Sequence, residues 1–76
     1  MTACVIGMGK IGLPLAVHLA SNGAECIGLD NDANVVAQIE AGQVPFPGEM
    51  DLENRMRDSL LNGQFRVTTS YEFAVS

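Results

Sequence analysis

The chain has 76 residues, about half of an average domain of ~150 residues, and is too short for an enzyme of several domains. Hydrophobic residues make up 47% and charged residues 17% of it, which excludes a disordered, highly charged chain and predicts a packed structure. Nine acidic residues against four basic ones give a net charge of −5, which argues against nucleic acid or an anionic membrane as a partner.

The N-terminal sequence carries no targeting signal. Residues 2–6 contain no basic segment, and glycines interrupt the apolar stretch long before the ~20 residues that a membrane span requires. We therefore expect a cytoplasmic protein that does not bind membranes. Cys4 and Cys26 lie in apolar runs without any extracellular signature, so both are expected to be buried and reduced.

The first third of the chain predicts a strand, a helix and a second strand. Residues 2–6 form an apolar run rich in β-formers, which is typical of a strand buried on both faces. From residue 11 apolar side chains recur at a spacing of four, which predicts a helix from about Lys10 to Asn22-Gly23. Residues 25–29 form the next apolar run, and strand, helix and strand together fit the ~30 residues of a parallel βαβ unit.

The rest of the chain predicts two helices and a third strand. Asn31 or Asp32 can cap a short helix that ends at Gly42, and the two prolines of residues 44–48 fix a loop. Residues 51–62 show the period of an amphipathic helix, and residues 65–69 are rich in β-formers. The expected fold is α/β, with a parallel three-stranded sheet and the element order β-α-β-α-α-β.

The C-terminal residues predict the start of another helix. Thr69 and Glu72 have the spacing of a capping box, but only four residues follow, whereas helices normally run ~8–20 residues. We therefore expect residues 1–76 to be the N-terminal part of a truncated domain. A frayed, disordered end is the alternative.

Residues 7–12, GMGKIG, match the pattern G-x-G-x-x-G in a context that favours dinucleotide binding. The motif follows a predicted strand, opens a predicted helix, and precedes an acidic residue, Asp30, by 18 positions. Gly7 allows the tight turn, Gly9 lets the backbone approach a pyrophosphate, and Gly12 lets the helix pack closely on the strand. The pyrophosphate would bind at the positive N-terminal end of that helix. Together with the order of the elements, the motif predicts the first β-α-β-α-α-β half of a Rossmann dinucleotide-binding fold, so residues 1–76 would be the N-terminal part of an NAD-binding domain.

Asp30 predicts NAD as the cofactor. A carboxylate at the end of the second strand accepts hydrogen bonds from the ribose hydroxyls, whereas it would repel the 2′-phosphate of NADP. Lys10 either contacts a phosphate or projects into solvent. The alternative is that the three glycines serve only the turn and that Asp30 is an ordinary helix cap.

Other polar residues favour structural roles. His18 has no second metal ligand at a suitable spacing and is expected at the surface, so no metal site is predicted. The acidic residues around the third helix suit solvation and the positive end of that helix; they are Glu49, Asp51, Glu53 and Asp58.

The run VIGMGKIGLPLA at residues 5–16 resembles the start of the nucleotide-sugar dehydrogenases, which comprise the UDP-glucose, UDP-N-acetylmannosamine and GDP-mannose 6-dehydrogenases. The resemblance continues through IGLDND at 27–32, IEAG at 39–42 and NGQFRVTT at 62–69, and so covers nearly the whole chain. It departs at residues 49–52, where the family often has EPGL, and at Val35, where many members have a basic residue.

The resemblance implies an NAD-dependent oxidoreductase that converts the primary alcohol of a UDP- or GDP-sugar to the uronate in two steps. The catalytic cysteine of such enzymes belongs to a later domain, so no catalytic residue is assigned here. Cofactor binding maps onto Gly7, Gly9, Lys10, Ile11, Gly12 and Asp30. The sugar nucleotide would bind to domains outside this chain, and we expect the whole protein to be a homo-oligomer.

Two alternatives stay open from the sequence. The chain could belong to an NAD dehydrogenase of the 3-hydroxyacyl-CoA or 3-hydroxyacid type, which shares the glycine turn. It could also be a nucleotide-binding module without catalytic activity, or a remnant of an enzyme.

Overall fold

The computed structural model of the chain describes residues 2–47 and 49–70. All six expected elements are present, with bounds within two residues of those predicted. In chain order they are β1 (Thr2–Ile6), α1 (Gly12–Ser21), β2 (Glu25–Leu29), α2 (Ala33–Glu40), α3 (Met50–Leu61) and β3 (Phe65–Thr68).

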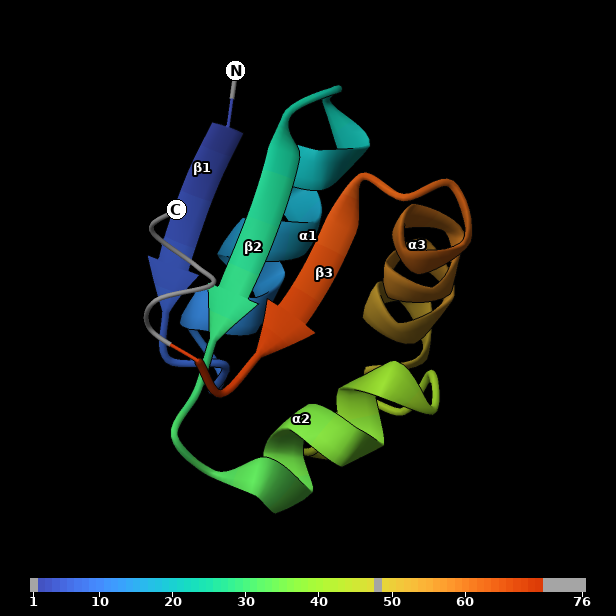
Figure 1. Cartoon of the computed structure of the whole chain (residues 1–76). Coiled ribbons are helices and arrows are strands. Elements are labelled where there is room, and N and C mark those ends of the chain that lie inside the picture. Colours follow the sequence, from blue (N-terminus) through green and yellow to red (C-terminus); the bar gives the residue numbers. More distant parts are fainter. Residues whose placement is uncertain (1, 48, 71–76) are drawn as a thin grey trace.

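The three strands form one parallel sheet in the order β1-β2-β3, which confirms the predicted α/β fold (Figure 1). The register places Ala3 beside Cys26, and Cys26 beside Phe65. Because all strands run in the same direction, the segments that follow them meet at one edge of the sheet. The glycine turn after β1 and Asp30 after β2 are therefore neighbours.

The helices pack against one face of the sheet and build the core there. Helix α1 contacts β1, β2 and α3, while α2 and α3 both contact β3 (Figure 1). This arrangement is expected when successive parallel strands are joined by right-handed crossovers, which place consecutive helices on the same side. The side chains at the centre of this core are fully buried: Met8, Leu13, Val17, Cys26, Ile39, Met56 and Phe65.

The prediction that β1 is buried on both faces is wrong. Its residues alternate between exposed and half-buried, with Ile6 73% exposed. Cys4 is also exposed, which corrects the expectation that both cysteines are buried; Cys26 is buried as expected. The reason is that the described helices pack only against the face that carries Ala3 and Val5.

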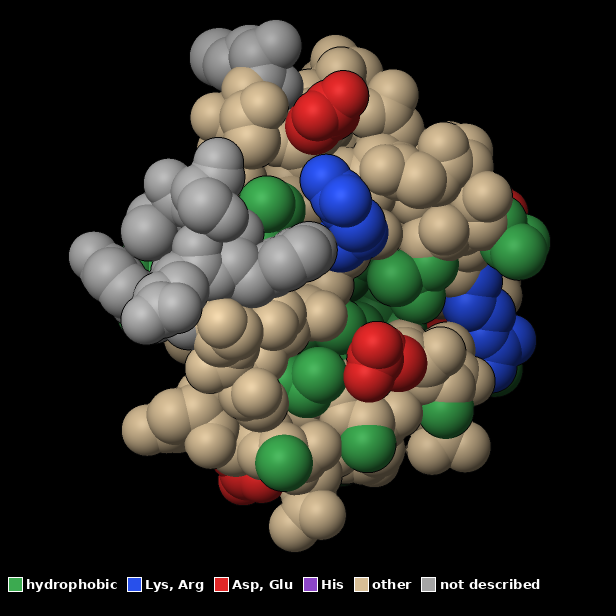
Figure 2. All heavy atoms as spheres, viewed as in Figure 1, with side chains coloured by type: hydrophobic (Ala, Val, Ile, Leu, Met, Phe, Trp, Pro, Cys, Tyr) green, Lys and Arg blue, Asp and Glu red, His purple; other side chains and the backbone are tan. Residues whose placement is uncertain are grey.

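The second face of the sheet is turned toward the viewer in Figures 1 and 2. On it Ile27 and Leu29 form a small buried cluster of their own, separate from the main core. Hydrophobic and charged side chains lie close together on this face in Figure 2. Adjacent residues of one strand point to opposite faces, so a continuous apolar run does not reveal which face is covered.

A side chain fixes the start of α2. Asp32 caps α2 by accepting a hydrogen bond from the Asn34 N–H at 2.9 Å.

The helix expected from Thr69 onward falls on residues 71–76, outside the described residues. Within the described part of the chain, no helix has the length and apolar character needed to cross a membrane.

Candidate dinucleotide-binding site

Residues 7–12 connect β1 to α1 and begin with a backbone conformation that favours glycine. Gly7 has a φ of +90°, which an L side chain rarely adopts. Its N–H donates to the Leu29 carbonyl oxygen at 2.7 Å, so the turn begins while still bonded to the end of β2. The fold itself therefore requires a glycine at position 7.

Gly12 is required for a different reason, namely close packing. A Cβ at this position would overlap the carbonyl oxygen of Gly7 and lie 2.9 Å from its carbonyl carbon. Both atoms belong to the backbone and cannot rotate away as a side chain would. The close approach of α1 to the turn therefore needs a residue without a side chain at position 12.

Gly9 differs from both, because nothing in the fold requires it. Its φ lies outside the left-handed region, and a Cβ built at this position has no heavy atom within 4 Å. The alternative that all three glycines serve only the turn therefore explains two of them. Gly9, the third glycine, leaves an open surface at the start of α1. A side chain there would contact no part of the described protein, but it would obstruct a ligand bound to this surface.

The N-terminus of α1 has no anionic group of its own. No side chain caps the helix, and its first turn contains no acidic residue. The other two helices differ: Asp32 caps α2, and α3 has two acidic residues in its first turn. The first N–H groups of a helix lack intrahelical acceptors and carry partial positive charge, so the start of α1 is suited to an anion from outside.

Lys10 and Ile11 lie on the exposed side of this turn. Both side chains are exposed, and Ile11, the residue before the first turn of α1, is 85% exposed. An ammonium group at this position adds to the positive potential at the helix N-terminus. An aliphatic side chain so far out of the core offers apolar contact area beside it.

Asp30 lies directly after β2 and is bonded to the glycine turn. Its Oδ2 accepts a hydrogen bond from the Met8 N–H at 2.9 Å, and its Oδ1 accepts one from the Asp32 N–H at 2.9 Å. The side chain that caps α2 is Asp32, so Asp30 is not the helix cap of the alternative interpretation. An ionised carboxylate has about four lone-pair sites, so two are left for a ligand.

A cleft of about 220 Å³ opens between the ends of β1 and β2. Asp30 and Gly7 line it, whereas the other predicted residues lie at the start of α1 outside its lining. Three further residues that line it lie outside the sequence motif: Ile6, Leu29 and Asn31. Their position at the ends of two parallel strands was a usable signal, because ligands of α/β folds bind at that edge.

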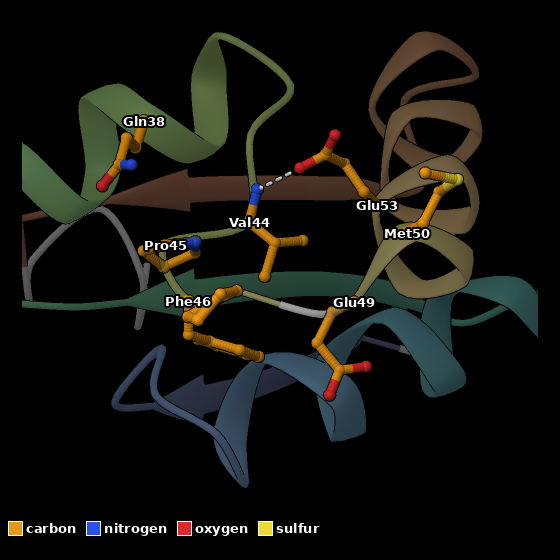
Figure 3. Close-up of a pocket in the computed structure, with 8 residues that line it drawn as sticks. Gln38, Val44, Pro45, Phe46, Glu49, Met50 and Glu53 are labelled. Atoms are coloured by element: carbon orange, nitrogen blue, oxygen red, sulfur yellow. Dashed lines mark hydrogen bonds between the residues drawn. The ribbon is translucent and has the colours of Figure 1, made fainter.

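A larger cavity, of about 740 Å³, lies between α2, α3 and the loop that joins them (Figure 3). It does not contain the glycine turn. Glu49 and Glu53 line it, and Glu53 already accepts a hydrogen bond from the Val44 N–H at 2.9 Å. Two carboxylates would repel a phosphate, so this cavity is not suited to the charged part of a dinucleotide.

The remaining candidates occupy structural positions. His18 is exposed, as expected, and lies 3.2 Å from the Asn22 side chain. Glu53 bridges the Val44 N–H and Arg57 instead of only facing solvent. Among the described residues, no group of three or more His, Cys, Asp or Glu side chains could hold a metal ion.

Comparison with known proteins agrees with this geometry. Residues 1–76 match the sequence profile described as UDP-glucose/GDP-mannose dehydrogenase family, NAD binding domain. UDP-N-acetyl-D-mannosamine dehydrogenase of Pyrococcus horikoshii is 35% identical over 72 residues, which cover 95% of this chain and 17% of that protein. The chain therefore spans only a small part of this relative.

Two solved structures contain the same arrangement of elements. UDP-D-ManNAc dehydrogenase from Pyrococcus horikoshii has a TM-score of 0.91 at 33% identity, over 96% of this chain and 17% of that one. A ternary complex of GDP-mannose dehydrogenase from Pseudomonas aeruginosa has a TM-score of 0.92 at 29% identity, over 99% and 17%. The chain belongs to the UDP-glucose/GDP-mannose dehydrogenase family, within its NAD binding domain.

Proposed function

We propose that residues 7–12 and Asp30 bind the adenosine and pyrophosphate part of NAD, in a protein that oxidises the primary alcohol of a UDP- or GDP-sugar to the carboxylate. Membership of the family supports this function over that of a 3-hydroxyacyl-CoA or 3-hydroxyacid dehydrogenase. The observation that carries the proposal is the open surface at Gly9, beside a helix N-terminus without a cap.

The described groups fit the two polar parts of this ligand. The pyrophosphate would lie on the first N–H groups of α1, over Gly9, with Lys10 contributing positive charge. The adenosine ribose would donate hydrogen bonds to Asp30, which lines the cleft and whose carboxylate is held by its bonds to the N–H groups of Met8 and Asp32. Bound NAD supplies the hydride acceptor, and these residues only bind and orient it.

Asp30 also selects between the two nicotinamide cofactors. A 2′-phosphate on the ribose would lie next to an ionised carboxylate, and two anions in contact repel each other. We therefore propose NAD rather than NADP as the cofactor.

Neither cysteine is proposed as the nucleophile of the oxidation. Burial raises the pKa of the Cys26 thiol, and the nearby Cys4 raises it further, which disfavours the reactive thiolate. Cys4 lies on β1, with its side chain on the sheet face away from the described helices. The sugar nucleotide and the catalytic thiol are accordingly assigned to parts of the full-length gene product outside these 76 residues.

We further propose a cytoplasmic, homo-oligomeric enzyme. The cytoplasmic location is supported by the two free thiols, Cys4 and Cys26. The oligomer is supported by the resemblance to the nucleotide-sugar dehydrogenases.

Calorimetric titration of the full-length gene product with NAD tests the proposed site. We expect Gly9→Ala to weaken binding about tenfold, equivalent to about 1.4 kcal/mol, with an unchanged midpoint of thermal unfolding. Asp30→Asn should also weaken binding by about tenfold, because it removes the negative charge that the ribose hydroxyls bond to.

Asp32→Asn is the matched control for the second variant. It lies two residues away, and asparagine caps a helix as well as aspartate does, so NAD affinity should stay at the wild-type value. Unchanged NAD affinity in both Gly9→Ala and Asp30→Asn would contradict the proposed site.

A further inference from the structure

Met8 lies between two glycines of an exposed turn, yet it is one of the most deeply buried residues. Its exposed fraction is 1%, and it belongs to the same core cluster as Leu13 and Phe65. A residue in the middle of a ligand-binding turn thus carries a side chain that reaches down into the core. The turn is therefore held by packing of the Met8 side chain in the core, in addition to its hydrogen bonds to the residues at the end of β2.

The space for this side chain is provided by Gly28, in the middle of β2. A Cβ at position 28 would overlap the Met8 Sδ and lie 3.0 Å from the Met8 Cε. It would also lie 3.3 Å from Cε1 of Phe65, so a second buried side chain borders the gap at Gly28. Gly28 is buried as well, and it has no positive φ that would explain a glycine in a strand.

The backbone of Met8 links this core contact to the candidate site. Its N–H donates to Asp30 Oδ2 at 2.9 Å, and the preceding N–H, that of Gly7, donates to the Leu29 carbonyl oxygen at 2.7 Å. The segment from Gly28 to Asp30 therefore holds the turn in two ways. Gly28 accommodates the Met8 side chain, while the Leu29 carbonyl oxygen and the Asp30 carboxylate each accept one hydrogen bond from the turn. A displacement of Met8 would shift both the peptide leading to Gly9 and the carboxylate of Asp30.

We propose that Met8 and Gly28 are positioning residues for the cofactor. The thioether of Met8, seated in the gap that Gly28 leaves in β2, sets the height of the glycine turn above the sheet and the direction of the Asp30 carboxylate. This role presupposes the NAD site proposed above. The Met8 side chain and Gly28 are both buried beneath the turn, so their effect on binding is transmitted through the backbone of the turn.

A double-mutant cycle on the full-length gene product tests the pair. Gly28→Ala should weaken NAD binding at least tenfold, because the new methyl group displaces Met8. Met8→Val removes both atoms that the methyl group would meet, Sδ and Cε, and should weaken binding only about threefold by itself. The double variant should bind NAD within about threefold of the wild type, whereas independent effects would multiply to about thirtyfold.

Amide hydrogen exchange at residues 7–9, measured without NAD, gives a second readout that does not depend on the proposed function. We expect faster exchange in Gly28→Ala and recovery in the double variant. Ile39→Val, which removes a methylene group from the same core on α2, is the control and should change neither readout.

The outcomes separate this proposal from that of the NAD site. A wild-type protein that does not bind NAD, with exchange at the turn restored in the double variant, would contradict the NAD site and support the coupling of Met8 to Gly28. Multiplicative losses of affinity, or exchange at the turn that Gly28→Ala leaves unchanged, would overturn the positioning role. Gly28→Ala by itself could also fail to fold. In that case, a double variant with Met8→Val that folds again supports the positioning role, and a double variant that stays unfolded overturns it.

Discussion

The three glycines of the turn differ in the reason for which a glycine is needed: the fold requires two of them, and the proposed ligand requires the third. Gly7 is set by its φ of +90° and Gly12 by the backbone that a side chain would meet, whereas Gly9 is restricted by neither. The sequence motif predicts a separate role for each of these glycines, and the structure supplies the physical reason for Gly7 and Gly12. Each role predicts a different experimental outcome.

We expect Gly12→Ala to destabilise the fold. The added Cβ would overlap the Gly7 carbonyl oxygen, so α1 or the turn must move, and overpacking of this kind typically costs about 1–3 kcal/mol. Denaturant unfolding of Gly12→Ala and Gly9→Ala side by side measures the difference. Equal free energies of unfolding in the two variants would contradict the distinction between these glycines.

The two thiols should differ in reactivity. In the native 76-residue chain at about pH 8, we expect iodoacetamide to modify Cys4, which is exposed, and to leave Cys26 unmodified until the chain is unfolded. Mass spectrometry of the peptides measures the extent at each site. Modification of Cys26 at the rate of Cys4 in the native chain would show that the core is open at β2.

The same thiol predicts how stability depends on pH. The pKa of Cys26 is raised above its usual value of 9.0 in the folded state, mainly by burial, so the folded chain holds this proton more tightly than the unfolded chain. The stability that this thiol contributes is fully present below pH 9.0, the usual pKa that applies to the unfolded chain. It is lost as the pH rises through the higher pKa of the folded state. Chemical denaturation of the wild type and Cys26→Ala across this range should show a smaller loss in the variant.

At the scale of the elements, the loop between α2 and α3 is held by two side chains of α3. Glu53 accepts a hydrogen bond from the Val44 N–H, and Arg57 donates one to the Gly42 carbonyl oxygen at 2.8 Å. Arg57 also pairs with Glu53 at 3.0 Å (Figure 3 shows the bond from Val44 to Glu53). Because both groups are partly exposed, the ion pair itself contributes little, and the bonds to the backbone matter more.

We expect Glu53→Ala to destabilise the chain by about 1 kcal/mol, the typical contribution of one hydrogen bond to a charged acceptor that is partly exposed. Amide exchange at Val44 should become faster, because its N–H loses its acceptor. Asp51→Ala is the control, since this acid lies in the same first turn of α3 and has no described bond to the loop. A slower or unchanged exchange at Val44 would contradict the role given to Glu53.

At the scale of the whole molecule, one face of the sheet is without helices among the described residues. Within the same residues β1 pairs only with β2, and Ile6 and Cys4 are exposed on that face. A chain of this size buries only ~60% of the surface of its unfolded state, which leaves little free energy to hold a half-covered sheet.

We therefore expect the isolated 76-residue chain to be marginally stable. Circular dichroism during heating, combined with sedimentation to establish the oligomeric state, measures this. A monomer that unfolds cooperatively near about 60 °C, within the range of ordinary complete domains, would contradict the expectation.

The order and type of the elements could be predicted from the sequence, because the signals are local. The apolar runs, the spacing of four in the helices, the helix cap at Asp32 and the glycine after β1 all act through neighbours in the chain. The NAD binding family could also be recognised, because residues 5–16 form one contiguous segment. The juxtaposition of Asp30 with the glycine turn followed from the parallel direction of β1 and β2.

The sequence by itself determined the elements, the turn and the residues that follow the strands, since these depend on backbone sterics and short-range spacing. Only the tertiary structure decided that Cys4 is exposed while Cys26 is buried, that Gly9 alone of the motif is unconstrained by the fold, and that Met8 fills the gap at Gly28. Each of these depends on atoms of other elements that lie far away in the chain. Burial is a property of what packs on a residue, and a residue's own type does not specify that.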